Sequence, residues 1–197
     1  MTSSELEIKK KAISKELNCG QDVISLIEKY FDLTKEANYI TSTSTAFNID
    51  NIRVKNISGI INLKHINDAR FLNKIFESTN LKLPNSGLYF GRVKTYPNRK
   101  KALLEKYPSI FNWFVYYFDT LFTRVFPKLK LTKKLYFYLT KGKSRVISKA
   151  ETFGRLYSCG FQIVDEKTIE KNQYFVAKKV KNPTYDCNPS YGPIVKL

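Results

Sequence analysis

The chain has 197 residues, enough for one domain of ordinary size that folds without disulfide or metal support. Hydrophobic residues make up 43% and aromatic residues 14% of it, which excludes a wholly disordered protein. The formal net charge of +17 exceeds what solubility requires, so we expect a polyanionic partner. Fifteen basic and only two acidic residues lie between Gly91 and Lys149, and the partner is expected to meet that segment.

Cysteine and histidine usage limits the chemistry that the chain can carry. Cys19, Cys159 and Cys187 are widely spaced and form no C-x-x-C pair, so we expect reduced thiols, with Cys159 in the core. The single histidine, His65, is expected to be a satisfied polar residue at a strand end. One histidine excludes a multi-histidine metal site, and the chain is expected to bind no metal or cofactor of its own.

The N-terminus shows no apolar run after Met1, so no secretory signal is expected. No stretch of about 18 uninterrupted apolar residues is present, so a simple transmembrane span is not expected either. These two observations favour a protein that lies inside the cell.

The first half of the sequence alternates helical and strand patterns. The expected elements are a helix from Ser3 or Ser4 to Cys19, a helix over 21–31, a strand within 38–47, a strand over 58–64, a helix capped by Asn67 and Asp68, and a strand over 88–94. The succession strand, helix, turn, strand predicts a right-handed βαβ unit.

The second half contains a basic, aromatic stretch followed by a strand pair. The expected elements are a basic helix from Pro97 to Tyr107, a helix over 109–126, a basic segment ending at Arg145, a helix from the Ser148–Glu151 capping box to Gly160, and an antiparallel pair over 161–165 and 173–179. We therefore predict an α/β domain over 1–182 with a helical insertion at about 97–147.

The strand segments resemble the second half of a class I methyltransferase-like Rossmann sheet. The resemblance rests on Ile60-Ile-Asn-Leu63, Gly87-Leu-Tyr-Phe90, Cys159-Gly-Phe-Gln-Ile163 and Tyr174-Phe-Val-Ala-Lys178. It implies a Rossmann-like fold, and an active or degenerate methyltransferase is one alternative function. Such enzymes use a glycine-rich turn after the first strand, whereas the first sixty residues here contain only Gly20 and Gly59.

A second group of segments resembles the N-terminal region of Bacteroidetes-type bacterial sugar transferases, which are polyprenyl-phosphate sugar-phosphate transferases of capsule and exopolysaccharide assembly. The segments are Arg124-Val-Phe-Pro-Lys-Leu129, Lys141-Gly-Lys-Ser-Arg-Val146, Lys149-Ala-Glu-Thr-Phe-Gly-Arg-Leu156 and Tyr185-Asp-Cys-Asn-Pro-Ser-Tyr-Gly-Pro193. The resemblance implies that 183–197 are a linker and the start of a catalytic region that the chain does not contain. It also implies magnesium for that missing half.

The segment from Ser109 to Phe126 carries an apolar stripe with aromatic residues around it. An interfacial or re-entrant helix suits it better than a membrane span, since aromatic rings flanked by basic residues prefer the headgroup level. The alternative is a core helix of a soluble fold. The candidate residues for membrane or anion contact are Trp113, Phe114, Tyr117, Phe118, Phe122, Arg124, Lys128, Lys130, Lys133, Lys134, Lys141, Lys143 and Arg145.

Other motifs predict no active site. Lys141-Gly-Lys-Ser144 lacks the upstream glycine of a phosphate loop, because position 137 is phenylalanine. Asp165 and Glu166 are adjacent in a strand and would point to opposite faces, which makes them a poor acid and base pair. Basic residues also attract nucleic acid, but aromatic residues on a helix do not favour base stacking, so this alternative is the weaker one.

Together these observations predict a non-catalytic, membrane-associated module of a sugar transferase at the cytoplasmic face of the bacterial inner membrane. Its expected partners are an anionic membrane surface or polyprenyl phosphate and the transferase catalytic domain. The chain alone is expected to have no transferase activity.

Overall fold

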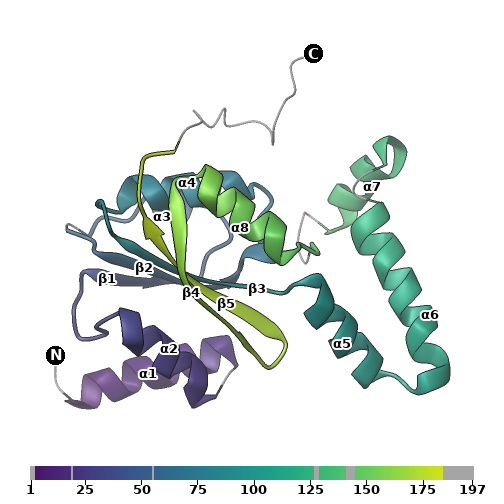
Figure 1. Cartoon of the computed structure of the whole chain (residues 1–197), viewed down its shortest axis with the longest axis horizontal. Helices are drawn as coiled ribbons and strands as arrows, with labels where there is room; N and C mark the ends of the chain where they lie inside the picture. Colours follow the sequence, from purple (N-terminus) through teal and green to yellow (C-terminus); the bar gives the residue numbers. More distant parts are fainter. Residues whose placement is uncertain (1–2, 19, 55, 127–128, 141–144, 184–197) are drawn as a thin grey trace.

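A computed structural model of the chain describes residues 3–18, 20–54, 56–126, 129–140 and 145–183. It shows an α/β body and a helical arm that projects from one edge of it (Figure 1). The predicted linker and catalytic start at 183–197 lie outside the described residues, apart from residue 183 itself.

The body is built on a five-stranded mixed sheet in the order β1-β2-β3-β5-β4. The strands are β1 (Asn38–Thr41), β2 (Gly59–His65), β3 (Leu88–Val93), β4 (Phe161–Ile169) and β5 (Asn172–Lys179). β1, β2 and β3 are parallel, whereas β5 pairs antiparallel with both β3 and β4. The predicted Rossmann-like α/β class and the final antiparallel pair are therefore confirmed.

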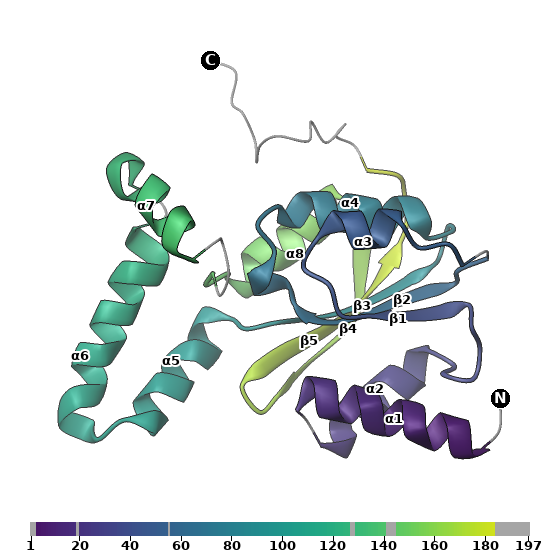
Figure 2. The same cartoon turned by 180° about the vertical axis from the view of Figure 1, so that it is seen from behind.

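Helices cover both faces of the sheet (Figure 2). One face carries α1 (Ser3–Leu17) and α2 (Gln21–Tyr30), and the other carries α3 (Ala46–Asp50), α4 (Leu72–Lys82) and α8 (Lys149–Ser158). The connections from β1 to β2 and from β2 to β3 run through α3 and α4. β1 and β2 are thus each followed by a helix on the same face before the next parallel strand, which is the arrangement of βαβ units.

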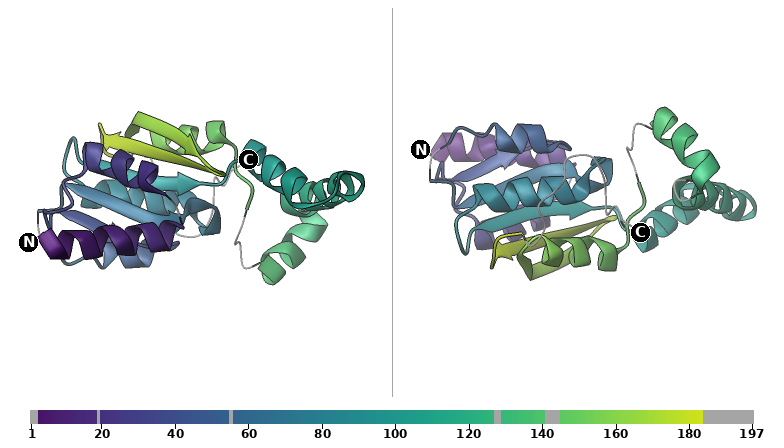
Figure 3. Two further views of the ribbon diagram at one scale, coloured as in Figure 1. Left: turned by 90° about the horizontal axis from the view of Figure 1, so that it is seen from below. Right: turned by 90° about the horizontal axis from the view of Figure 1, so that it is seen from above.

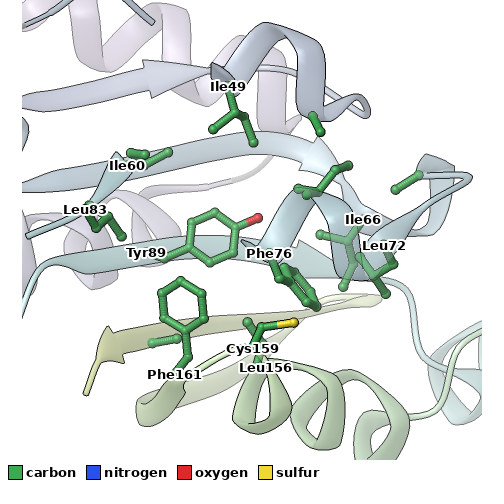
Figure 4. Packing of buried hydrophobic residues seen from close by; sticks show 14 of the residues in the cluster. Ile49, Ile60, Ile66, Leu72, Phe76, Leu83, Tyr89, Leu156, Cys159 and Phe161 are labelled. Atoms are coloured by element: carbon green, nitrogen blue, oxygen red, sulfur yellow. The ribbon is translucent and has the colours of Figure 1, made fainter. Parts of the chain in front are cut away.

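Each face of the sheet has its own hydrophobic core. The α3, α4 and α8 side centres on Tyr89, whose ring lies about 6 Å from those of Phe76, Phe161 and Phe175. Figure 4 shows this cluster, with Cys159 among its members. The α1 and α2 side packs Val23, Ile24 and Ile27 against strand residues such as Phe90 and Val176. The prediction that Cys159 belongs to the core is confirmed.

Three elements differ from the sequence prediction. Asn67 and Asp68 do not cap a helix: they lie in a short 3-10 helix, η1 (Ile66–Asp68), and α4 begins later, at Leu72. The expected helix over 109–126 divides into α6 (Ser109–Thr120) and a π-helix, η2 (Leu121–Val125). The basic segment after it contains a further helix, α7 (Lys130–Thr140).

The helical arm consists of α5 (Tyr96–Lys106), α6, η2 and α7. It lies between β3 and α8 in the chain and extends beyond the carboxyl end of β3 (Figures 1 and 3). A parallel β-bridge between Thr95 and Ile147 brings its two ends together. In the chain the arm is therefore inserted between β3 and α8 of the body.

Candidate functional site

The base of the arm is held by Asn67, which is 4% exposed. Its side-chain Nδ2 donates to the carbonyl oxygens of Lys94, at 2.9 Å, and of Arg145, at 2.6 Å. Its Oδ1 accepts a bond from the Lys94 amide at 2.7 Å, and its own carbonyl accepts one from the Arg145 amide at 3.2 Å. One buried residue thus binds the main chain on both sides of the arm.

A second contact supports α5 from the body. Lys171, in the turn between β4 and β5, forms an ion pair with Glu105 at 3.0 Å. Next to it, Asn172 Oδ1 lies 2.8 Å from His65 Nε2, which confirms His65 as a satisfied polar residue at the end of a strand. Burial, more than the nearby cations, lowers the pKa of His65 below its usual value, so the ring is neutral at pH 7.

Polar contacts join α5 to α6 on the inner side of the arm. Arg99 Nε donates to Asp119 Oδ2 at 2.7 Å, and a second guanidinium nitrogen contacts Oδ1. Asn112 donates to the carbonyl of Leu104, and the Thr123 hydroxyl in η2 donates to the carbonyl of Asp119 at 2.6 Å. A bidentate arginine–carboxylate pair is a strong and directional contact, so it fixes how the two helices pack.

A cluster of aromatic rings lies along the same pair of helices. Trp113 and Tyr116 have ring centroids 5.8 Å apart at an angle of 87°, and Tyr96 and Tyr117 lie against them at about 6 Å. The Lys100 ammonium sits 5.3 Å from the Trp113 ring and 5.2 Å from the Tyr116 ring. Farther along, Phe122 packs against Tyr136 of α7 at 5.5 Å.

The outer side of the arm is apolar and exposed. Phe114 is 66% exposed, Phe118 71% and Tyr138 81%. Among the described residues, twelve of the twenty exposed large hydrophobic side chains belong to the arm, namely Phe111, Trp113, Phe114, Tyr117, Phe118, Leu121, Phe122, Val125, Leu129, Leu135, Tyr138 and Leu139. The arm therefore buries Tyr116 and Tyr136 beside its ion pair but leaves most of its large apolar side chains exposed, whereas a helix packed in water turns its apolar side inward.

The sequence-predicted candidates are only partly described. Trp113, Phe114, Tyr117, Phe118 and Phe122 are exposed on the arm, together with Lys134. Arg124 lies in η2 and Lys130 and Lys133 lie in α7, but their side chains fall outside the description, as do Lys128, Lys141 and Lys143 entirely. Arg145 lies half-buried at the arm's base, where burial, followed by repulsion from Arg155, lowers its pKa.

Sequence reasoning missed several residues of this surface. Leu135 and Leu139 of α7 were not recognised, although Leu131, Leu135 and Leu139 recur at the four-residue spacing of a helix face. The roles of Asn67, Lys100 and Tyr116 depend on contacts with residues distant in the sequence or on another helix. The local sequence contains no signal for such contacts.

The carboxyl edge of the parallel strands carries a different polar arrangement. Buried Asn62 of β2 exchanges two hydrogen bonds with the loop after β1: its Oδ1 accepts from the Thr43 amide, and its Nδ2 donates to the Thr43 carbonyl. The Thr45 amide donates to Thr43 Oγ1 at 3.1 Å. In Rossmann folds the loop after the first strand meets a nucleotide, whereas here the amides of Thr43 and Thr45 are bonded within the protein.

Other features of the described residues add no active site. Asp165 contacts Lys29 and Tyr30 on one face, whereas Glu166 contacts Lys149 on the other, so the two carboxylates diverge as predicted. No cluster of three or more potential metal-ligating side chains occurs among the described residues. An open hollow of about 450 Å³ lies on α1, where Lys11, Ser14, Lys15 and Asn18 line it. No helix in the described part of the chain is both long and apolar enough to cross a bilayer.

Comparisons with known proteins give little further guidance. No family model matches the chain, and no curated protein matches it. Among solved structures, an O-methyltransferase family protein from Burkholderia thailandensis is similar over 70% of this chain and 34% of its own, with a TM-score of 0.37 and 9% identity. The chain spans about a third of that protein's length, and a similarity this weak carries no argument about function. None of these comparisons supports the resemblance to sugar transferases.

Proposed function

We propose that this protein is a membrane-docking α/β domain, and that its helical arm binds anionic lipid surfaces. The observation that carries the proposal is the exposed apolar surface of the arm, which includes the Phe114 and Phe118 rings, while Asp119 of the same helix is paired with Arg99 of α5. Contiguous exposed apolar surface marks contact with a membrane or with another protein. Exposed aromatic rings suit the headgroup region, where one part of a ring meets lipid and another meets water.

The charge of the arm favours an anionic membrane over a neutral apolar partner. Between Tyr96 and Arg145 the sequence contains twelve basic and two acidic residues. Both acidic side chains, Glu105 and Asp119, are engaged in ion pairs with described residues, so they do not offset the remaining basic residues at the surface. Each basic residue near an anionic leaflet contributes about 1 kcal/mol of attraction.

The length of the arm's main helix favours a position in the interface rather than across it. α6 and η2 together run from Ser109 to Val125, which at 1.5 Å per residue is about 26 Å. A hydrocarbon core of about 30 Å would not be spanned, and the ion pair on the inner side would be costly there. A helix lying in the plane of the surface keeps the side that faces α5, with the ion pair, away from the hydrocarbon.

A narrower form of the proposal follows the sequence resemblance to bacterial sugar transferases. In that form the domain is an accessory module at the cytoplasmic face of the inner membrane, where such enzymes act on polyprenyl phosphate. This form rests on sequence segments alone, and the membrane proposal does not depend on it.

The protein contains a single tryptophan, Trp113, and it lies in the arm, so its fluorescence reports docking directly. On addition of phosphatidylglycerol-containing vesicles we expect a blue shift of Trp113 emission and quenching by brominated acyl chains. The response should grow with the fraction of anionic lipid. Absence of both signals at low salt would end the proposal.

Paired variants separate the apolar and the ionic contributions. Phe114→Ser with Phe118→Ser should reduce vesicle binding at every salt concentration while the melting temperature is kept, because both rings are exposed. The matched control is Phe47→Ser with Leu81→Ser, which removes similarly exposed apolar side chains from the body. Equal losses in both pairs would contradict a specific role of the arm.

Four arm lysines test the ionic contribution. Changing Lys128, Lys130, Lys133 and Lys134 to glutamine should weaken binding and flatten its salt dependence, because screening acts over about 10 Å at 0.1 M salt. The control changes four exposed lysines of the body, Lys11, Lys15, Lys167 and Lys181, to glutamine. Binding of nucleic acid by the wild type that is unaffected by the phenylalanine variants would favour the nucleic-acid alternative instead.

A further inference from the structure

The aromatic cluster of the arm has the form of a cation-binding site. Trp113 and Tyr116 meet almost at a right angle, 87°, and so form two adjoining walls. Tyr96 flanks Tyr116 at 6.1 Å, and Tyr117 flanks Trp113 at 6.2 Å. Aromatic faces arranged in this way attract cations through the ring quadrupole, and they are the usual receptors for quaternary ammonium groups.

A cation already occupies this corner. The Lys100 ammonium lies 5.3 Å from one ring centroid and 5.2 Å from the other, within the roughly 6 Å range of cation–π attraction. Lys100 reaches the rings from α5, whereas both walls belong to α6, so the ammonium is brought in across the helix pair. Lys100 has no carboxylate partner among the described ion pairs, unlike its neighbours Arg99 and Lys101.

The corner is open on one side. Trp113 is about half exposed and Tyr117 is exposed, whereas Tyr116 is buried and forms the base. The Trp113 ring is therefore partly accessible to a ligand from solvent. The Arg99–Asp119 pair joins α5, which carries Lys100, to α6, which carries both rings.

We infer that Trp113 and Tyr116 form a binding site for a quaternary ammonium group, and that Lys100 fills this site in the absence of ligand. The inference deepens the proposed membrane function, on which its lipid form rests, because phosphocholine headgroups carry such a group next to a phosphate. When the headgroup ammonium enters the corner, the displaced Lys100 ammonium is free to pair with that phosphate. The exchange leaves the number of cations at the rings unchanged.

A titration without lipid tests the site independently of membrane docking. Tetramethylammonium chloride is added at constant ionic strength near 0.15 M, where charge repulsion from the arm is screened beyond about 8 Å. Trp113 fluorescence is the readout. Lys100→Ala should respond saturably and bind at least about three times more tightly than the wild type, since the competing ammonium is gone.

Lys101→Ala is the matched control, because it removes the same charge one residue away and leaves Lys100 in the corner. It should behave like the wild type. Equal tightening in both variants would show a general charge effect and overturn the inference, as would a linear, unsaturable response of Lys100→Ala. Tyr96→Leu, at the flank of the site, should weaken the response of Lys100→Ala.

Soluble phosphocholine and phosphatidylcholine vesicles then separate the two sources of the ligand. Binding of tetramethylammonium and phosphocholine without binding to phosphatidylcholine vesicles would support the site and contradict its lipid form, while the phosphatidylglycerol vesicles decide the anionic-membrane proposal separately. The opposite outcome would keep the membrane proposal and overturn the site: vesicle binding is identical in the wild type and in Trp113→Leu, and Lys100→Ala shows no response to tetramethylammonium.

Discussion

The side-chain amide of Asn67 lies 2.6 Å from the carbonyl oxygen of Arg145, a residue 78 positions later in the chain. The same amide nitrogen also binds Lys94, so the two strands of chain that lead into and out of the arm are joined through one buried side chain. Through this contact the position of the arm is tied to the carboxyl end of β2.

Replacing Asn67 should therefore loosen the arm as well as destabilise the body. For Asn67→Ala we expect a loss of about 2–3 kcal/mol in the free energy of unfolding, because three side-chain hydrogen bonds disappear at a buried site. Asn67→Asp should be at least as harmful, since a carboxylate cannot donate to the two carbonyls. Urea denaturation measures the loss, and Trp113 fluorescence anisotropy reports the mobility of the arm.

Asn51→Ala is the control for this change, because the Asn51 side chain is exposed and binds only a carbonyl of its own helix. It should change stability little. If Asn67→Ala melted like the wild type with unchanged Trp113 anisotropy, the joining role of Asn67 would be wrong.

The body could be predicted from the sequence because its elements have clear local signals. Ser58 to Lys64 is apolar at its centre as a buried strand should be, and Ser148 accepts the Glu151 amide as the capping pattern predicts. The arm was predicted less completely. In the sequence, basic residues interrupt the helical repeat of α7. The change from α6 to η2 coincides with the hydrogen bond from the Thr123 hydroxyl to the Asp119 carbonyl, and no sequence motif predicts that bond.

The contacts that define the candidate site could not be predicted from the sequence, for a physical reason. Asn67 shows a helix-cap pattern locally, yet its hydrogen bonds go to residues 27 and 78 positions away. Likewise, the sequence indicates that Phe114 and Phe118 are apolar but not whether they face a core or solvent. That distinction depends on which side of α6 meets α5, and only the structure provides it.

S-adenosylmethionine is expected not to bind, although the sheet is Rossmann-like. The Thr43 amide is already bonded to Asn62 and the Thr45 amide to Thr43, so these two donors of the loop after β1 are not free for a cofactor, and the loop lacks the glycine-rich turn. Calorimetry should show no heat of binding. Micromolar affinity would restore the methyltransferase alternative, and Asn62→Ala would then be the first variant to examine.

The Cys159 thiol should be unreactive in the folded protein. Burial, with a smaller contribution from nearby Glu77, raises its pKa to about 12, so at pH 8 only roughly one molecule in ten thousand carries the thiolate. In a Cys19→Ser, Cys187→Ser background, a thiol reagent should modify Cys159 only as fast as the domain unfolds. The rate should therefore rise steeply with urea, and rapid labelling without denaturant would contradict the burial of this side chain.

Asp165 should make the stability of the domain depend on pH. Its carboxylate accepts bonds from Lys29 Nζ at 2.8 Å and from the Tyr30 hydroxyl at 2.7 Å. These two bonds, with the Lys29 bond contributing more, hold the pKa of Asp165 below its usual value.

A carboxyl group whose pKa is lowered by folding stabilises the folded state above its unfolded pKa, near 4, and loses that contribution as the pH falls through the folded value. Asp165→Asn should therefore be modestly less stable than the wild type at pH 7, while the two proteins converge as the pH falls below the folded pKa of Asp165. Urea denaturation at several pH values measures the difference, with Asp50→Asn, at the exposed end of α3, as the control. A difference between Asp165→Asn and the wild type that stayed constant from neutral to acidic pH would show that these bonds do not act through the charge of Asp165.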